Sequence, residues 1–169
     1  SLINDGDTIQ IGLGSVSMAA GFYLREKNDL GVHSEIITSA MIDLYKRGVI
    51  TGKRKTLNPH KMVATGMFLE PQDYGFVDGN PTIELRDAFY TNNPVVIAQH
   101  HNQVAINNAL AVDFTGQVTA EALGPQMYTG VAGQLDFVLG SYLSPGGKSI
   151  TVLPSTARGG TVSRIVSMF

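Results

Sequence analysis

Short apolar runs alternate with helix-like stretches in the N-terminal part of the chain, and this alternation limits the fold more than any other feature. In the first run, Ile9, Ile11 and Leu13 alternate with polar or small residues, which predicts a strand. The expected order is strand, helix, strand and helix, at residues 8–13, 15–27, 34–38 and 40–47. This order favours a parallel sheet with right-handed crossovers. We therefore expect a three-layer α/β domain with a largely parallel sheet.

The rest of the chain is less regular but carries further strand and helix patterns. Strands are expected at residues 61–68, 95–99, 104–110, 149–153 and 161–166, and a hairpin strand at 117–120. A helix is expected at residues 133–142, with one side formed by Leu135, Val138, Leu139 and Tyr142. Because no internal repeat or long linker divides the sequence, residues 1–169 are expected to form a single domain.

Composition excludes several functional classes. The 169 residues include 12 Lys and Arg against 14 Asp and Glu, a net charge of −2, which argues against a protein that binds nucleic acid. The sequence has no apolar run of the ~18 residues that a membrane span requires, and no signal peptide. It contains no cysteine, which excludes disulfides, thiolate metal sites and a cysteine nucleophile and fits a cytoplasmic location. The histidines at 33, 60, 100 and 101 lack the spacing of metal ligands, so no metal is expected.

The two ends of the chain suggest a larger protein. The sequence begins with Ser1 rather than Met, and it ends at Met168 and Phe169 directly after an apolar run. We therefore expect a piece of a longer polypeptide.

The turn after the first expected strand is a candidate binding site. Gly12 and Gly14 allow the backbone to approach a ligand closely, and the helix that follows presents free N–H groups to negative charge. A tight turn that needs glycine only for packing would explain the same pattern. A second glycine-rich segment, with Gly130 and Gly133, opens the helix expected at residues 133–142 and would add N–H donors to the same pocket.

Glu35 lies on the second expected strand, about 20 residues after the first glycine turn. The carboxyl ends of parallel strands meet at one edge of the sheet, where open α/β sheets bind ligands. One interpretation is a dinucleotide site, although Ser17 stands where that motif has its third glycine. The other is catalytic, with Glu35 as a carboxylate nucleophile and loop N–H groups that stabilise an oxyanion. A glutamate that simply faces water at a strand end is the plain alternative.

Segments spread over nearly the whole chain resemble the acetyl-CoA hydrolase/transferase family and follow the family's order. They include residues 31–35, 46–51, 59–65, 80–81, 96–99, 104–107, 112–118, 128–137 and 153–157. The resemblance is to the C-terminal of two related domains and stops before that domain usually ends.

The resemblance implies a Rossmann-like CoA-transferase fold and an enzyme that moves CoA between an acyl-CoA and a carboxylate. The family's nucleophile is the glutamate of a His-(Ser/Thr)-Glu motif, which corresponds to Glu35, and it would form a mixed anhydride and then a glutamyl-CoA thioester. Residues similar to the family's oxyanion and CoA-contacting positions are Gly12, Gly14, Val16, Gly130, Gly133 and Gln134. Two alternatives stay open, namely an acyl-CoA hydrolase, in which water replaces the acceptor, and a non-catalytic dinucleotide-binding domain.

The resemblance also implies the partners. CoA is a substrate, no tightly bound cofactor is expected, and the acyl donors and acceptors are short-chain acids of the 4-hydroxybutyrate, acetate and butyrate type. An N-terminal domain of the same protein would complete the CoA site, so the isolated chain is expected to be inactive, and the full-length protein to form a homodimer. The basic run Lys53–Lys55 is interpreted as a solvated loop, with contact to CoA phosphates as the alternative. The sequence departs from the family at residues 14–17, 38–40 and 132, which leaves the acyl group undetermined.

Overall fold

The computed structural model describes residues 2–169, apart from the side chains of Met18, Ala20 and Phe22. A six-stranded sheet forms its centre, in the order β12-β7-β1-β2-β4-β6, and every pair of neighbouring strands is parallel. The strands are β1 (Thr8–Ile11), β2 (Gly31–His33), β4 (Met62–Ala64), β6 (Ile83–Leu85), β7 (Gln103–Asn108) and β12 (Lys148–Val152). The predicted parallel sheet is therefore confirmed.

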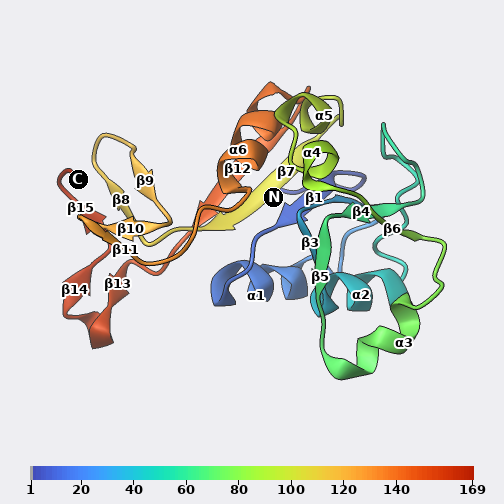
Figure 1. The fold of residues 1–169 in the computed structure, drawn as a ribbon, viewed down its shortest axis with the longest axis horizontal. Coiled ribbons are helices and arrows are strands. Elements are labelled where there is room, and N and C mark those ends of the chain that lie inside the picture. The colour runs from blue at the N-terminus through green and yellow to red at the C-terminus, as the bar shows by residue number, and fades with distance from the viewer. Residues whose placement is uncertain (1) are drawn as a thin grey trace.

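Helices cover both faces of this sheet, which confirms the three-layer α/β class (Figure 1). One face carries α1 (Ser15–Tyr23), α2 (Ser39–Lys46), the 3-10 helix η1 (Pro71–Asp73) and α3 (Tyr74–Val77). The other carries α4 (Ala88–Thr91), α5 (Pro94–Ala98) and α6 (Gln134–Leu143). The core lies between α2 and the sheet, where Ile9, Val32, Met41, Leu44 and Ile106 are at most 2% exposed.

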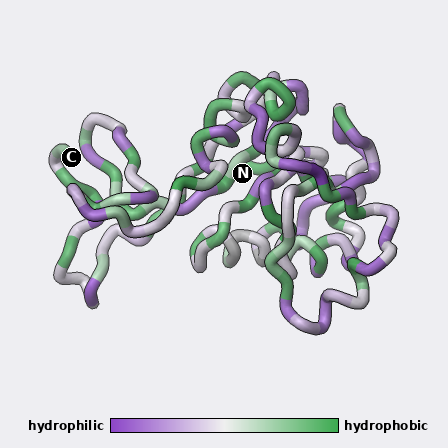
Figure 2. The backbone as a smooth tube through the Cα atoms, in the orientation of Figure 1, coloured by the Kyte–Doolittle hydropathy of each residue, from purple (hydrophilic) through white to green (hydrophobic). Residues whose placement is uncertain are grey.

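A smaller extension of short strands projects away from the six-stranded sheet (Figure 1). It holds the sheet β15-β8-β9, formed by Ile165–Val166, Ala111–Asp113 and Val118–Thr119, and the pairs β10 (Ala122–Leu123) with β11 (Gln126–Met127) and β13 (Thr156–Ala157) with β14 (Val162–Ser163). A 3-10 helix, η2 (Arg158–Gly160), lies between β13 and β14. Apolar residues continue into this extension (green in Figure 2), where Phe114 and Tyr128 are mostly exposed. The hairpin expected at residues 117–120 is present as the antiparallel pair of β8 and β9.

Two expected strands are each divided in the structure. The strand expected at 61–68 is β4 and β5 (Gly66–Phe68), separated at Thr65, and the strand expected at 161–166 is β14 and β15, separated at Arg164. The strand expected at 34–38 is only β3 (Ile36–Thr38), which pairs outside the main sheet with β5, whereas the main-sheet strand β2 ends before it, at His33. Glu35 therefore lies at a break between two strands rather than on one.

The strand prediction for residues 95–99 is wrong, because this segment is helix α5. The Asn93 side chain accepts a hydrogen bond from the Val95 N–H at 2.9 Å, and Pro94 occupies the first turn. A capping asparagine followed by proline is a strong helix start, and it overrides the β-branched sequence Val95–Ile97.

The side of α6 that carries Leu135, Leu139 and Tyr142 faces outward, with Leu135 and Tyr142 73% and 80% exposed. The helix packs instead through Phe137, Gly140 and Ser141. Gly140 lets α6 approach α5 closely, since an added Cβ would lie 2.5 Å from Cβ of Ile97. Among the helices of residues 2–169, none is both long and apolar enough to cross a membrane.

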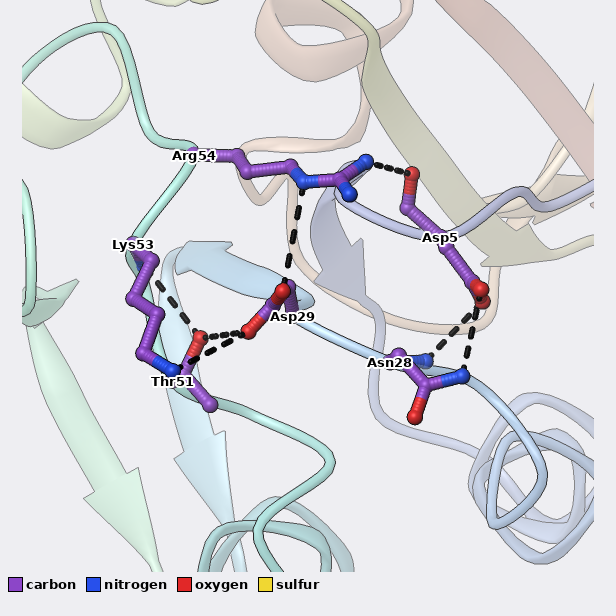
Figure 3. A network of polar contacts seen from close by, with 6 residues as sticks. All are labelled: Asp5, Asn28, Asp29, Thr51, Lys53 and Arg54. Atoms are coloured by element: carbon purple, nitrogen blue, oxygen red, sulfur yellow. Dashed lines mark hydrogen bonds and ion pairs between the residues drawn. The ribbon is translucent and has the colours of Figure 1, made fainter.

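The basic run Lys53–Lys55 has two environments, and the solvated-loop prediction is wrong for one residue. Lys53 and Arg54 are exposed and lie 3.8 and 4.0 Å from the carboxylate of Asp29 (Figure 3). Lys55 is only 5% exposed, and its Nζ donates to the backbone carbonyls of Val32 and Lys61 at 2.8 and 2.7 Å. Burial also lowers the Lys55 pKa from 10.5 to about 7. Through its two hydrogen bonds, the amine connects β2 to the segment before β4 rather than facing a ligand.

Candidate functional site

Glu35 is held at the carboxyl ends of the central strands by its own backbone. Its carbonyl oxygen accepts hydrogen bonds from the N–H groups of Thr65 and Gly66 at 2.9 and 3.0 Å. One residue earlier, the Ser34 N–H donates to the Val63 carbonyl at 3.0 Å. These bonds fix the main chain on both sides of the break between β2 and β3, and the half-buried Glu35 side chain leaves from this fixed point.

The Glu35 carboxylate reaches the N-terminus of α6. Its Oε2 accepts a hydrogen bond from the Gly133 N–H at 3.1 Å. The approach is close, since an added Cβ on Gly133 would lie 2.8 Å from Glu35 Oε2 and 2.1 Å from Asn92 Nδ2, and both side chains would have to shift. Two residues that are 98 positions apart in the chain therefore meet at one carboxylate.

A pocket of about 350 Å³ opens beside Glu35, at the edge where the parallel strands end. Its lining includes three of the glycine-segment residues predicted from the sequence, Gly12, Gly130 and Gln134. Gly14 and Val16 belong to the same turn as Gly12 but do not line this pocket. Gly133 lines a second hollow together with Phe89, Asn92 and Asp136. Glu35 is part of the lining of both hollows.

A pair of buried amides, which the sequence did not single out, forms part of the pocket lining. Gln10 and Asn107 lie on the neighbouring strands β1 and β7 and are 3% and 4% exposed. The Gln10 Nε2 donates to Asn107 Oδ1 at 2.9 Å, and the Asn107 Nδ2 donates to Gln10 Oε1 at 3.0 Å. Each amide therefore satisfies the other without a charge, as buried polar groups require. An amide side chain next to isoleucine within each of two expected strands is the signal that would have indicated them.

Asn92 is a second residue that the sequence analysis missed. Its Oδ1 accepts a hydrogen bond from the Thr91 hydroxyl at 3.0 Å, which leaves its Nδ2 on the side of Gly133 and Glu35. Thr91 is in turn fixed by His33, whose Nε2–H donates to the Thr91 carbonyl at 2.9 Å. His33, two positions before Glu35, thereby connects the strand that leads to the carboxylate with the end of α4.

His33 is fully buried and uncharged in this setting. Its ring lies 4.5 Å from the ring of His100, which is also fully buried. Burial lowers the pKa of His33 from 6.5 to about 4, and burial followed by the neighbouring His33 lowers the pKa of His100 to about 2. Neither imidazole is therefore a cation at neutral pH, and their role is packing and hydrogen bonding.

The arrangement combines a carboxylate, backbone N–H groups and open space, which is the chemistry of nucleophilic attack on a carbonyl. No group of three His, Cys, Asp or Glu residues within residues 2–169 has the geometry to hold a metal ion.

Comparison with known proteins identifies relatives that cover nearly the whole chain. The chain is 45% identical over 168 residues to the 4-hydroxybutyrate coenzyme A transferase of Clostridium kluyveri, covering 99% of this chain and 39% of that protein. The crystal structure of RipA from Yersinia pestis superposes with a TM-score of 0.95 at 40% identity, over 99% of this chain and 38% of that one. The 4-hydroxybutyrate CoA-transferase structure from Porphyromonas gingivalis gives 0.89 at 40% identity, over 99% and 40%.

The chain spans about two fifths of the length of these relatives. Residues 71–169, more than half of the chain, match the family described as acetyl-CoA hydrolase/transferase C-terminal domain. This match includes α6 and the glycine segment before it, and Glu35 itself lies N-terminal to the matched residues. The chain belongs to the acetyl-CoA hydrolase/transferase family.

Proposed function

We propose that the full-length protein is a CoA-transferase and that Glu35 is its nucleophile. The observation that carries this proposal is the hydrogen bond from the Gly133 N–H to the carboxylate of the half-buried Glu35, a residue that lines two hollows. A carboxylate in such a place is available to a thioester, and a fixed N–H group is available to the charge that develops on the carbonyl oxygen.

The proposed reaction proceeds by exchange at two carbonyl carbons. A Glu35 oxygen attacks the thioester carbonyl of the acyl-CoA, the C–S bond breaks, and CoA leaves as a thiolate while a mixed anhydride forms. The thiolate then attacks the carbonyl carbon of Glu35, and the acyl group leaves as a free carboxylate. The resulting glutamyl-CoA thioester reacts with the acceptor carboxylate by the reverse sequence, which restores Glu35.

The relatives' names support short-chain acids as substrates. They include transferases for 4-hydroxybutyrate and for butyrate with acetate. In our proposal residues 1–169 form the catalytic domain, the remainder of the polypeptide completes the CoA site, and two copies associate. The isolated chain would then show little or no turnover. Hydrolysis is the competing outcome if water reaches the Glu35 thioester before an acceptor does.

The test uses the full-length enzyme with butyryl-CoA and acetate. Glu35→Gln removes the nucleophilic oxygen while keeping the side-chain shape, and we expect the exchange rate to fall by about 10³-fold or more. Glu26→Gln, a matched change at an exposed glutamate, should leave the rate unchanged. Reduction of the reacting enzyme with borohydride, followed by mass spectrometry, should place the modification at Glu35. Full exchange activity of Glu35→Gln would refute the assignment.

A further inference from the structure

The turn that leads into α1 is held from outside by a residue of another strand. Gly14, at the N-cap of α1, has φ 147° and no side chain, so it cannot cap the helix itself. Instead the Ser17 N–H donates to Oδ1 of Asn108, which lies 91 positions away at the end of β7. Asn108 therefore performs the capping role that a side chain at position 14 usually has.

The same carboxamide binds the turn at two further points. Its Nδ2 donates to the Leu13 carbonyl at 3.0 Å and to the Ser17 hydroxyl at 2.6 Å. The Ser17 hydroxyl, which is fully buried, donates in turn to the Gly12 carbonyl. Both ends of the turn are thereby tied to one asparagine. The fit is close, since an added Cβ on Gly14 would lie 2.2 Å from Asn108 Nδ2.

This clamp borders the Glu35 site. Asn108, Gly12 and Leu13 line the same 350 Å³ pocket as Glu35. Among the described residues, none accepts a hydrogen bond from the backbone N–H groups of Ser15 and Val16, because they are the first donors of α1. Donors of this kind contribute to catalysis only when their direction is fixed before the reaction begins.

We propose that Asn108, together with Ser17, is a positioning residue that fixes the turn of residues 12–16 beside Glu35. The proposal rests on the proposed function, since it assigns the turn to the reaction that Glu35 carries out. Asn108 acts through the turn and touches no reacting atom. Its removal lets the Leu13 carbonyl and the Ser17 N–H turn away, and the free N–H groups then lose their direction.

The test measures turnover of the full-length enzyme per reactive Glu35, counted by borohydride trapping. For Asn108→Ala we expect kcat to fall about 10- to 100-fold while KM for the acyl-CoA changes much less, because misplaced groups near a reacting centre cost rate. Ser17→Ala, which hardly changes the volume of the site, should lower kcat about tenfold. If Asn108→Ala does not fold, Ser17→Ala tests the positioning role by itself. Asn4→Ala, at an exposed side chain with no hydrogen bond of its own, is the control.

Two results distinguish failure of this positioning role from failure of the proposed function. If the wild type shows no trapped Glu35, the proposed function fails, whereas hydrogen exchange of residues 12–18 still reports whether Asn108→Ala loosens the turn. If Glu35 is trapped and kcat per trapped site is unchanged in Asn108→Ala and Ser17→Ala, the positioning role is refuted. The double variant should be no slower than Asn108→Ala alone, because both side chains belong to one network. Fully additive losses would also overturn the proposal.

Discussion

Gly133→Ala tests the geometry around Glu35 with one methyl group. The backbone of Gly133 has φ −72° and ψ 9°, which alanine adopts without strain. The new Cβ would lie 2.8 Å from Glu35 Oε2 and 2.1 Å from Asn92 Nδ2, and both atoms would have to withdraw towards the 3.4 Å of ordinary contact. The 3.1 Å hydrogen bond between the Gly133 N–H and Glu35 is then lengthened or lost.

The expected cost follows from the kind of bond involved. A hydrogen bond to a charged group contributes about 1.5–3 kcal/mol, and partial exposure of Glu35 places this one at the lower end. A loss of about 1.5–2 kcal/mol corresponds to a roughly 10- to 30-fold lower kcat/KM. The fold should be affected little, because the two displaced atoms are the ends of flexible side chains.

The assay compares kcat/KM and melting temperature of the full-length enzyme with butyryl-CoA and acetate. Gly75→Ala, in α3, is the matched control because nothing lies within 4 Å of its added Cβ. It should change neither quantity. If Gly133→Ala melts like the wild type and keeps its full kcat/KM, then the contact between Gly133 and Glu35 has no role in the reaction.

Two further predictions concern the surroundings of the site. Gly140→Ala should lower the melting temperature and kcat together, because its Cβ would lie 2.5 Å from Cβ of Ile97 and would push α6, which carries Gly133 at its start, off α5. The lowered pKa of His33 means that only the unfolded chain binds a proton between about pH 6.5 and 4. The free energy of unfolding is therefore unaffected by this histidine above pH 6.5 and decreases by about 3 kcal/mol as the pH falls to 4. Between pH 7 and pH 5, the melting temperature of His33→Leu should fall less than that of the wild type. The exposed control His101→Leu should show the same fall as the wild type. A fall in His33→Leu equal to that of the wild type would contradict this prediction.

Local patterns in the sequence predicted the parallel sheet and the three longest helices, α1, α2 and α6, because alternation and helical spacing are properties of neighbouring residues. The segment at residues 95–99 shows the limit of such patterns. Three β-branched residues favour a strand there, and only the capping contact of Asn93 decides for a helix. Similarly, the pattern placed Glu35 within a strand, whereas bonds from Thr65 and Gly66 hold it at a break.

Contacts between distant residues were beyond the reach of local patterns. The amide pair of Gln10 and Asn107 and the clamp of Asn108 on Ser17 exist only because β1 and β7 are neighbours in the sheet. The order of strands along a sheet is set by packing of the whole chain, and no spacing within the sequence reports it. The burial of Lys55 has the same origin, since its acceptors belong to two other segments.

The site beside Glu35 depends on two parts of the fold, the sheet and helix α6. The carboxylate is fixed by the sheet, through the backbone bonds of Glu35 to Thr65 and Gly66. Its N–H donor is fixed by α6, which packs on β7, β12 and α5 through its buried side, with Gly140 close to Ile97 of α5. The position of the Glu35 carboxylate is therefore set by the sheet, and that of its donor by the packing of α6. Changes in the contact between α5 and α6 should consequently alter the reactivity of Glu35 without touching any residue of the pocket.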